Sequence, residues 1–425
     1  MSPITRQLFA LLLIHAVLVT LGLHVVFSVP RAATLAHHLD AFAARSQAGD
    51  SWKPMAAARV TASEHPGASI YEDVFFRHQT KFQYPPSALL FVGSLERPAL
   101  NAISWCAVWL TVLFTVVLFE GNLRQTATPI GGLADTTLRT LVLAALALTF
   151  YPLLKAYSLG QIQVWIDLAF AALVWAWWRG APALSGVALG IVCLIKPHFI
   201  LLAGWGLARR QWRFAAACAS TVAAGLALSL AAFGLPTHLD YLRVVSYISR
   251  RGEAFYANQS INGLLNRSFG NGDSLVWHGN AFPPEHAGVY AGTLLLGAVC
   301  VGAALWLPRR AAHGSLLDLS IGALTIVIVS PIAWEHHFGI LLPLLAVTTP
   351  RLLSGPPAGR WTPVVLGGAF VLTGQYFEPA QRLASSWLNV LQSYVLIGAL
   401  VLLAVWHRAA RRSFSTASPH RVISG

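Results

Sequence analysis

The sequence from residue 162 to residue 210 reads IQVWIDLAFAALVWAWWRGAPALSGVALGIVCLIKPHFILLAGWGLARR. It holds three apolar runs, 162–178, 184–195 and 199–208, which are separated by Arg179 and by Lys196-Pro197-His198. A helix that crosses a bilayer needs about 20 mostly apolar residues. Apolar runs that are closed by basic residues predict helices packed within a membrane rather than in a water-soluble core.

The rest of the chain has the same character. Of its 425 residues, 56% are hydrophobic and 11% are charged, and the mean hydropathy is +0.61. A typical soluble domain carries about 25% charged residues. This composition excludes a soluble globular enzyme, a disordered protein and a small disulfide-stapled module. It indicates an all-α protein that crosses a membrane several times.

Twelve apolar runs are candidate membrane spans. Several are short and need a tilted helix or a locally thinned bilayer. A further stretch, 88–95, is too short to span and is a candidate re-entrant segment. The first run is not expected to be a cleaved signal, because its apolar core is too long and no small-x-small cleavage site follows it. The runs are 8–29, 99–119, 138–154, 162–178, 184–195, 199–208, 214–233, 289–307, 317–332, 338–347, 364–373 and 388–406.

Basic residues orient the predicted bundle. The chain carries 29 Lys and Arg against 16 Asp and Glu, a formal charge of +13. The positive-inside rule places the basic loop ends and the tail, 407–425, in the cytoplasm, and an even number of spans then puts both termini there. Two long segments, 30–83 and 234–286, face outward, and 1–425 form one membrane domain. The orienting residues are Arg179, Arg209, Arg210, Arg213, Arg309, Arg310, Arg351, Arg360, Arg408, Arg411, Arg412 and Arg421.

Ionisable residues near the membrane are costly and therefore mark candidate sites. Lys196 precedes the helix-breaking Pro197 at the predicted outer face, where it could neutralise a phosphate or only reach the interface. The stretch 330–337, Ser-Pro-Ile-Ala-Trp-Glu-His-His, lies at the same face. Adjacent His336 and His337 point about 100° apart on a helix, so one histidine facing a ligand is more natural than a two-His metal clamp. The alternative is a belt of interfacial residues.

Amides and carboxylates add further candidates. Gln161 and Gln163 stand at the start of a membrane helix, where they could bind sugar hydroxyls or a neighbouring helix. The segment 258–263, Asn-Gln-Ser-Ile-Asn-Gly, is amide-rich, as carbohydrate sites often are. In the first outer segment, Asp50 could act as a base or could cap the helix that follows it.

Taken together, these stretches resemble glycosyltransferase family 87, membrane transferases of the GT-C superfamily that depend on polyprenyl-phosphate sugars. Five matching stretches in the family's order, with Ser-Pro-x-x-Trp-x-His-His among them, form a specific signal. They are Gly67-Ala68-Ser69-Ile70-Tyr71 with Phe82-Gln83-Tyr84-Pro85-Pro86, Leu159-Gly160-Gln161-Ile162-Gln163, Gly190 to Ile195-Lys196-Pro197, Asn258-Gln259-Ser260-Ile261-Asn262-Gly263-Leu264, and Ser330-Pro331-Ile332-Ala333-Trp334-Glu335-His336-His337.

The resemblance implies a GT-C-like bundle of about twelve transmembrane helices. It also implies an inverting transfer of a sugar, with mannose expected, from a polyprenyl phosphate to a hydroxyl of a lipid or glycan acceptor. Asp50 would be the general base, with Asp40 as the alternative because the spacing from Asp50 to Tyr71 is longer than usual. The resemblance assigns Lys196, His336 and His337 to the donor phosphate, and Tyr84, Gln161, Asn258 and Trp334 to the substrates.

No metal ion or other cofactor is expected, since neither a glycine-rich nucleotide loop nor an Asp-x-Asp signature is evident in the sequence. No nucleic-acid partner is expected either, because cytoplasmic basic loops and binding to anionic membrane lipids account for the positive charge. We expect a protein of the bacterial inner membrane with its active site facing outward. The competing interpretation is a transporter or flippase of lipid-linked sugars. That class predicts an internal repeat and charges near mid-membrane, whereas the charges here cluster at one face.

Overall fold

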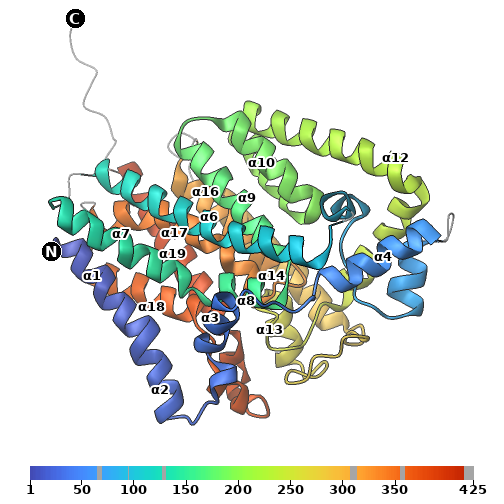
Figure 1. Ribbon diagram of the computed structural model, residues 1–425, viewed down its shortest axis with the longest axis horizontal. Coiled ribbons are helices and arrows are strands. Elements are labelled where there is room, and N and C mark those ends of the chain that lie inside the picture. Colours follow the sequence, from blue (N-terminus) through green and yellow to red (C-terminus); the bar gives the residue numbers. More distant parts are fainter. Residues whose placement is uncertain (65–68, 94, 127–130, 307–313, 355–358, 416–425) are drawn as a thin grey trace, which may run out of the picture.

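The computed structural model describes residues 1–425 except 65–68, 94, 127–130, 307–313, 355–358 and 416–425. The described residues form helices and their connections (Figure 1), with one isolated β-bridge between Asn258 and Trp334. The predicted all-α class is confirmed. Gly67 and Ala68 of the first matching stretch, and the basic residues Arg309, Arg310 and Arg421, lie outside the described residues.

The helices vary from single turns to 40 residues. In chain order they are α1 (Pro3–Leu12), η1 (Leu13–Val19), α2 (Thr20–Val25), η2 (Arg31–Ala33), α3 (Leu35–Ala43), α4 (Trp52–Glu64), η3 (Tyr71–Arg77), η4 (Pro86–Ala88), α5 (Leu89–Val92), α6 (Arg97–Arg124), α7 (Leu133–Leu148), α8 (Tyr151–Leu159), α9 (Gln163–Trp178), α10 (Pro182–Ile195), η5 (Pro197–Phe199), α11 (Ile200–Ala208), α12 (Trp212–Arg251), α13 (Ile261–Ser268), α14 (Ala287–Leu305), α16 (Leu316–Val329), η6 (Glu335–Ile340), α17 (Leu341–Ser354), α18 (Thr362–Gly374), η7 (Glu378–Leu383), η8 (Trp387–Ser393) and α19 (Tyr394–Ser415).

The protein is a multi-pass membrane protein. Within the described residues, six helical stretches are long and apolar enough to cross a membrane, and α7 and α8 add a seventh if the pair, bent by 51°, acts as one span. Five shorter apolar stretches of 10–17 residues accompany them. Each of the twelve predicted runs overlaps these helices, but the run 138–154 is divided between α7 and α8. The number of about twelve spans stays a prediction.

The two predicted outer segments contain helices rather than irregular loops. The first, 30–83, folds into α3, α4 and single turns on either side of them. In the second, α12 continues to Arg251 across a kink at Gly234, where φ is +74°, and α13 follows. Glycine adopts this left-handed backbone region without the steric cost that a side chain would add.

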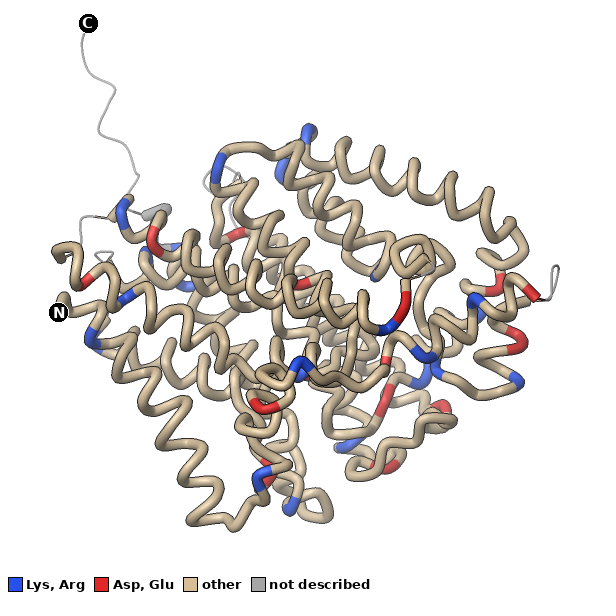
Figure 2. The backbone as a smooth tube through the Cα atoms, in the orientation of Figure 1, with Lys and Arg blue, Asp and Glu red and all other residues tan. Residues whose placement is uncertain are grey.

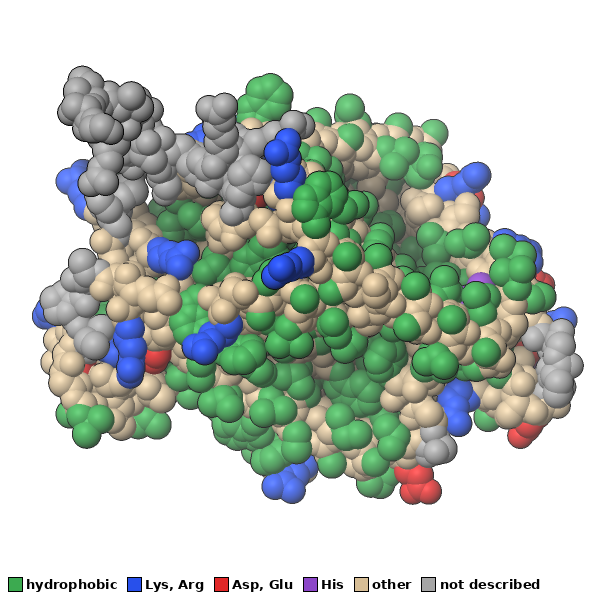
Figure 3. Space-filling view, turned by 90° about the horizontal axis from the view of Figure 1, so that it is seen from above, with side chains coloured by type: hydrophobic (Ala, Val, Ile, Leu, Met, Phe, Trp, Pro, Cys, Tyr) green, Lys and Arg blue, Asp and Glu red, His purple; other side chains and the backbone are tan. Residues whose placement is uncertain are grey.

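The buried centre of the bundle is built from α9, α16 and α17 (Figure 1). In α16 the segment from Leu319 to Ile328 is buried on all its faces, which explains why it is apolar without an amphipathic period. Peripheral helices such as α14 instead expose Leu295 and Val299, as expected of residues that contact lipid. Hydrophobic side chains accordingly cover much of the face shown in Figure 3.

The bundle has two chemically different ends. At one end, which we call the basic end, α6 and α9 finish while α7 and α16 begin. Arg139 of α7 binds Glu120 of α6 at 2.7 Å, and Arg209 binds Asp318 of α16 at 2.9 Å. At the opposite end, the site end, α8 finishes at Leu159 and α9 begins. Figure 2 shows charged residues mainly on connections and near helix ends.

Candidate active site

The segment 48–51 is bound to the α8–α9 turn. The amides of Ala48, Asp50 and Ser51 donate hydrogen bonds of 2.8, 2.9 and 3.1 Å to the carbonyl groups of 158–160. Gly160 has φ +68°, and a Cβ added there would collide with the carbonyl oxygen of Ala48. Only glycine fits this close approach. The turn therefore fixes the backbone that carries Asp50.

Gln161 connects Asp50 to Tyr84. Its Nε2 donates a hydrogen bond of 2.5 Å to Oδ2 of Asp50. Its Oε1 accepts hydrogen bonds from the hydroxyl groups of Ser51, at 2.6 Å, and of Tyr84, at 3.1 Å. The structure thus brings three residues of the sequence-predicted site, Asp50, Tyr84 and Gln161, into one hydrogen-bonded network.

The Asp50 carboxyl group is reachable and partly desolvated. The residue is exposed, but the protein around its carboxyl group raises the pKa above its ordinary value by desolvation. The hydrogen bond from Gln161 and the positive charges of Lys155 and Lys53 oppose this rise in pKa. A carboxylate with a raised pKa that remains accessible is suited to take a proton from a hydroxyl group.

The alternative base, Asp40, has a different environment. It lies on α3, and Nη2 of Arg31 donates hydrogen bonds of 2.9 and 2.7 Å to its two carboxylate oxygens. The side chain of Asp40 is 58% exposed and that of Arg31 is 67% exposed. Asp50, and not Asp40, makes direct hydrogen bonds to another predicted site residue within the described part of the chain.

Lys196 is the centre of a second polar group. It ends α10, and its Nζ donates a hydrogen bond of 2.6 Å to Oε1 of Gln163. Nε2 of Gln163 in turn donates to Oδ1 of the fully buried Asp167 at 2.7 Å. The rings of His336 and His337 are 4.8 Å apart, and both lie within electrostatic range of Lys196. The predicted phosphate-binding residues are therefore gathered together.

Glu335 lies beside this group and is held by tyrosines. The hydroxyl of Tyr394 donates to its Oε1 at 2.5 Å, and the hydroxyl of Tyr151 donates to Oε2 at 3.4 Å. Lys155 lies within electrostatic range of both Glu335 and Asp50. The neighbouring Trp334 is only partly buried, with its ring centre 6.5 Å from that of Phe255.

Asn258 is fully buried and its amide is used within the protein. Its Nδ2 donates to the carbonyl groups of Glu253 and Pro331 at 2.9 and 3.1 Å, and its Oδ1 accepts from the amide of Ala333 at 2.9 Å. The backbone of Asn258 also forms the isolated bridge to Trp334. The structure brings Asn258 to the site end, but both of its N–H groups bind other parts of the chain.

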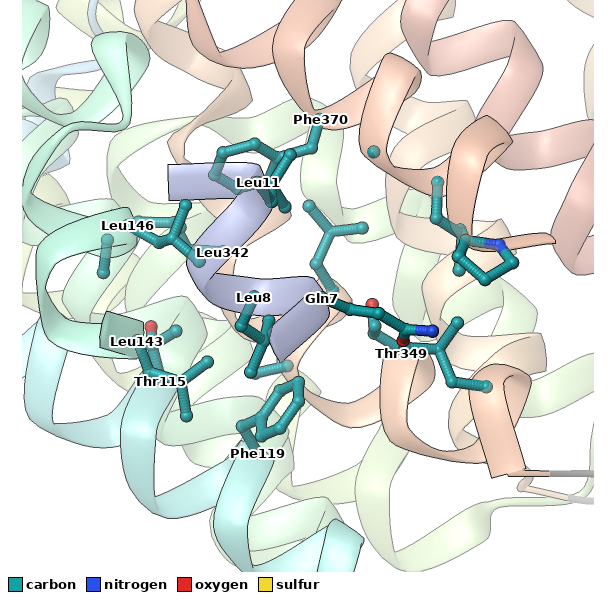
Figure 4. A pocket seen from close by; sticks show the side chains of 17 residues that line it. Gln7, Leu8, Leu11, Thr115, Phe119, Leu143, Leu146, Leu342, Thr349 and Phe370 are labelled. Atoms are coloured by element: carbon teal, nitrogen blue, oxygen red, sulfur yellow. The ribbon is translucent and has the colours of Figure 1, made fainter. Parts of the chain in front are cut away.

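Two cavities differ in chemistry. One of about 470 Å³ lies between α3, the Asp50 segment and α8, and it is lined by Tyr151, Lys155, Tyr256 and Tyr376 among others. Another of about 110 Å³ is lined mostly by apolar side chains of α1, α6, α7, α17 and α18 (Figure 4). No sequence-predicted site residue lines the apolar cavity.

Sequence reasoning missed Lys155 and Asp167. Lys155 directly follows the apolar run 138–154, and Asp167 lies inside the run 162–178. A single charged residue within or directly beside an apolar run was the available signal, because such a residue needs a partner or a function. Lys155 stands at the break between two runs and Asp167 lies inside one, and neither was among the predicted site residues.

No metal centre is apparent in the described ranges, where no group of three or more His, Cys, Asp and Glu side chains is arranged to hold an ion. The site therefore consists of a reachable carboxylate with a neutral amide partner, and a cationic group around Lys196. This set of residues can deprotonate a hydroxyl and can stabilise a phosphate that carries negative charge.

Comparisons with known proteins find one family model and several relatives that resemble this chain. The family model of glycosyltransferase family 87 matches residues 82–331. A polyprenol-phosphate-mannose-dependent alpha-(1-2)-phosphatidylinositol pentamannoside mannosyltransferase of Mycobacterium tuberculosis is 28% identical over 73% of this chain and 68% of its own length. Its namesake in Mycolicibacterium smegmatis is 26% identical over 69% of this chain and 67% of its own length. A polyprenol-phosphate-mannose-dependent alpha-(1-2)-phosphatidylinositol mannoside mannosyltransferase of M. tuberculosis is 25% identical over 67% of this chain and 68% of its own length. No solved structure matches.

Proposed function

Because this chain belongs to glycosyltransferase family 87, we propose that its Asp50 site transfers mannose from a polyprenyl-phosphate-mannose donor to a hydroxyl of a lipid-linked acceptor, with inversion. The protein is a membrane mannosyltransferase, a hexosyltransferase. The observation that supports the Asp50 site is the hydrogen bond from Gln161 to the carboxyl group of Asp50, an exposed residue. Lys196 and two histidines lie at the same end of the bundle.

The first part of the mechanism is proton removal. The acceptor hydroxyl approaches Asp50, and its oxygen attacks the anomeric carbon of the donor while its proton passes to the Asp50 carboxylate. Gln161 holds that carboxylate through one N–H group and adds no charge of its own. Tyr84 and Ser51 fix the amide of Gln161, so they position the base through it.

The second part is departure of the phosphate. The bond between the anomeric carbon and the phosphate oxygen breaks, and its electron pair leaves with polyprenyl phosphate. The added negative charge needs preorganised cations or donors, and Lys196 with His336 or His337 provides them. Gln163 orients the ammonium group of Lys196 by a hydrogen bond of 2.6 Å.

The other predicted residues take different roles. Trp334 is partly exposed at the site end and is available to contact a substrate sugar. Asn258 contributes indirectly, because its buried amide binds the backbone of 331–333 and so holds Trp334 and the histidines in place. We therefore treat Asn258 as a positioning residue.

Membrane orientation follows from the two ends of the bundle. Basic residues such as Arg124, Arg179 and Arg209 end α6, α9 and α11 at the basic end, while Asp50 and Lys196 belong to the site end. The positive-inside rule favours a cytoplasmic basic end and an outward-facing site. We propose about twelve spans in one GT-C-like membrane domain, the short apolar helices included, with both termini in the cytoplasm. The family membership does not favour the transporter or flippase interpretation.

The test is transfer by the purified protein from polyprenyl-phosphate-mannose to a phosphatidylinositol mannoside. Asp50→Asn should lower kcat by roughly 10²–10⁴, the range expected for loss of a general base. Asp40→Asn is the matched control, because it neutralises a carboxylate of the same outer segment, and it should stay near wild type. Near-normal turnover of Asp50→Asn, or loss of turnover in Asp40→Asn alone, would contradict the assignment of Asp50.

A further inference from the structure

The cavity of about 470 Å³ beside Asp50 has the size of a small-molecule site, for which about 300–1,000 Å³ is usual. Residues of α8 line it, together with Ala48 of the Asp50 segment. The amide of Asp50 donates a hydrogen bond of 2.9 Å to the carbonyl of Leu159. The cavity therefore begins at the backbone that carries the proposed base.

One wall of the cavity is aromatic. The rings of Tyr151 and Tyr376 are stacked with centres 5.6 Å apart and planes 15° apart. Tyr256 follows, with its ring 5.7 Å from that of Tyr376, and the hydroxyl of Tyr376 donates to that of Tyr256 at 3.1 Å. Aromatic side chains of this kind pack against the C–H face of a pyranose ring, while the hydroxyl groups of Tyr376 and Tyr151 donate to Tyr256 and Glu335.

Polar side chains line the cavity beside these rings, and the ring of His38 lies edge-on to that of Tyr151 at 5.1 Å. His38 of α3 shares a hydrogen bond of 2.6 Å with the hydroxyl of Ser158. Burial, with the nearby charges of Lys155 and His37, lowers the pKa of His38 to about 2, so its imidazole is neutral. Lys155 Nζ is 5.8 Å from the ring centre of Tyr151 and makes no hydrogen bond within the part of the chain that the structure describes.

The charges around the cavity favour a neutral ligand. The positive charge of Lys155 lies within electrostatic range of two carboxylates, Asp50 and Glu335. A phosphate in this cavity would be repelled by the negative charges of those two carboxylates. Lys196 instead has an amide, histidines and the single carboxylate Asp167 around it. A polyhydroxylated sugar without charge fits the cavity better than the phosphate of the donor does.

We propose that this cavity binds the acceptor's sugar, with the aromatic side chains around Tyr376 as its apolar contact and Lys155 and His38 as hydrogen-bonding groups. The inference rests on the proposed function, because it places the attacked hydroxyl at Asp50. The donor then approaches from the side of Lys196.

The test measures the acceptor and the donor separately, with octyl α-mannoside as the acceptor probe and polyprenyl-phosphate-mannose as the donor. Tyr376→Ala should raise the acceptor KM roughly tenfold, equivalent to the loss of one good aromatic contact, and leave the donor KM within about twofold. Tyr376→Phe keeps the ring and should stay close to wild type. Tyr290→Ala, which removes a partly exposed tyrosine of α14, is the matched control.

A second variant tests the cavity without removing an aromatic ring. Ala41 lines the cavity, so Ala41→Trp should fill it and weaken acceptor binding, measured calorimetrically with the donor-free protein. An unchanged acceptor KM in both Tyr376→Ala and Ala41→Trp, or a rise in donor KM alone, would overturn the proposal while the mannosyltransferase activity stands. If wild-type protein transfers no mannose but binds octyl α-mannoside in a Tyr376-dependent way, the proposed function fails and the pocket assignment stands.

Discussion

At the scale of single residues, the site depends on how Asp50 is balanced between protonation and ionisation. Desolvation raises the pKa of its carboxyl group, while the Gln161 amide and two lysines lower it. The oxygen of Gln161 accepts from Ser51 and Tyr84, which orients the amide so that its N–H group faces the carboxylate. The hydrogen bonds therefore fix the orientation of the Asp50 carboxylate, and the groups around it set its pKa.

This balance predicts the pH dependence of transfer. Asp50 acts as a base only when ionised, so kcat/KM should fall as the pH drops through the pKa of its carboxyl group. Because this pKa is raised, the fall on the acid side of the pH–rate profile should occur above about 4, the pKa of an ordinary aspartate. Lys155→Met removes a charge that lowers this pKa, so the limb should move to higher pH, and Lys155→Arg should restore it. Lys53→Met, which removes the more exposed and weaker of the two charges, should move it less.

A pH–rate profile distinguishes this electrostatic role of Lys155 from a structural one. A variant that only disturbs packing lowers kcat/KM at every pH without moving the limb. An unshifted profile for Lys155→Met, or an equal shift for Lys53→Met, would contradict the proposed control of Asp50 by Lys155. The groups that face Asp50 are Lys155 from α8, Lys53 from α4 and the neutral Gln161.

At the scale of elements, the amide-rich segment 258–263 joins parts of the chain that are distant in sequence. Asn258 binds the 331–333 backbone, and Gln259 binds the carbonyl of Gln392 at 2.7 Å and the amide of Val395 at 3.1 Å. The segment thus connects the second outer segment to η6 and α19. Buried amides with all of their groups paired make such a joint rigid, because any displacement leaves a polar group unsatisfied.

These hydrogen bonds predict that substitution of Asn258 and substitution of Asn389 lower the thermal stability of the protein by different amounts. Asn258→Ala leaves the buried amide of Ala333 without its acceptor, at a cost of about 1–3 kcal/mol, and should lower the thermal unfolding midpoint in detergent. Asn389→Ala removes one hydrogen bond from a partly buried side chain and should lower it less. Equal midpoints for the two variants would contradict the structural role of Asn258, and retained stability with a higher acceptor KM would assign it to substrate.

At the scale of the whole molecule, the sequence predicted the all-α membrane class and the stretches that meet at the site end. Apolar runs and basic loop ends report directly on burial in lipid, so the helices coincide with the predicted runs. The partners of Asp50 could not be predicted with the same certainty. Lys155 lies on α8, which is bent by 51° from α7, and residue spacing does not encode such a bend or the approach of Lys155 to Asp50.

The arrangement of the two ends predicts the orientation of the molecule. In a variant with alanine at Cys106, Cys193, Cys218 and Cys300, Ser63→Cys on exposed α4 should react with an impermeant maleimide in intact cells. Arg360→Cys, exposed between α17 and α18, should react only after permeabilisation, because the positive-inside rule holds the basic end in the cytoplasm. The opposite labelling pattern would place the Asp50 site in the cytoplasm. Because both cysteines are exposed, a difference in reactivity reports the side of the membrane rather than burial.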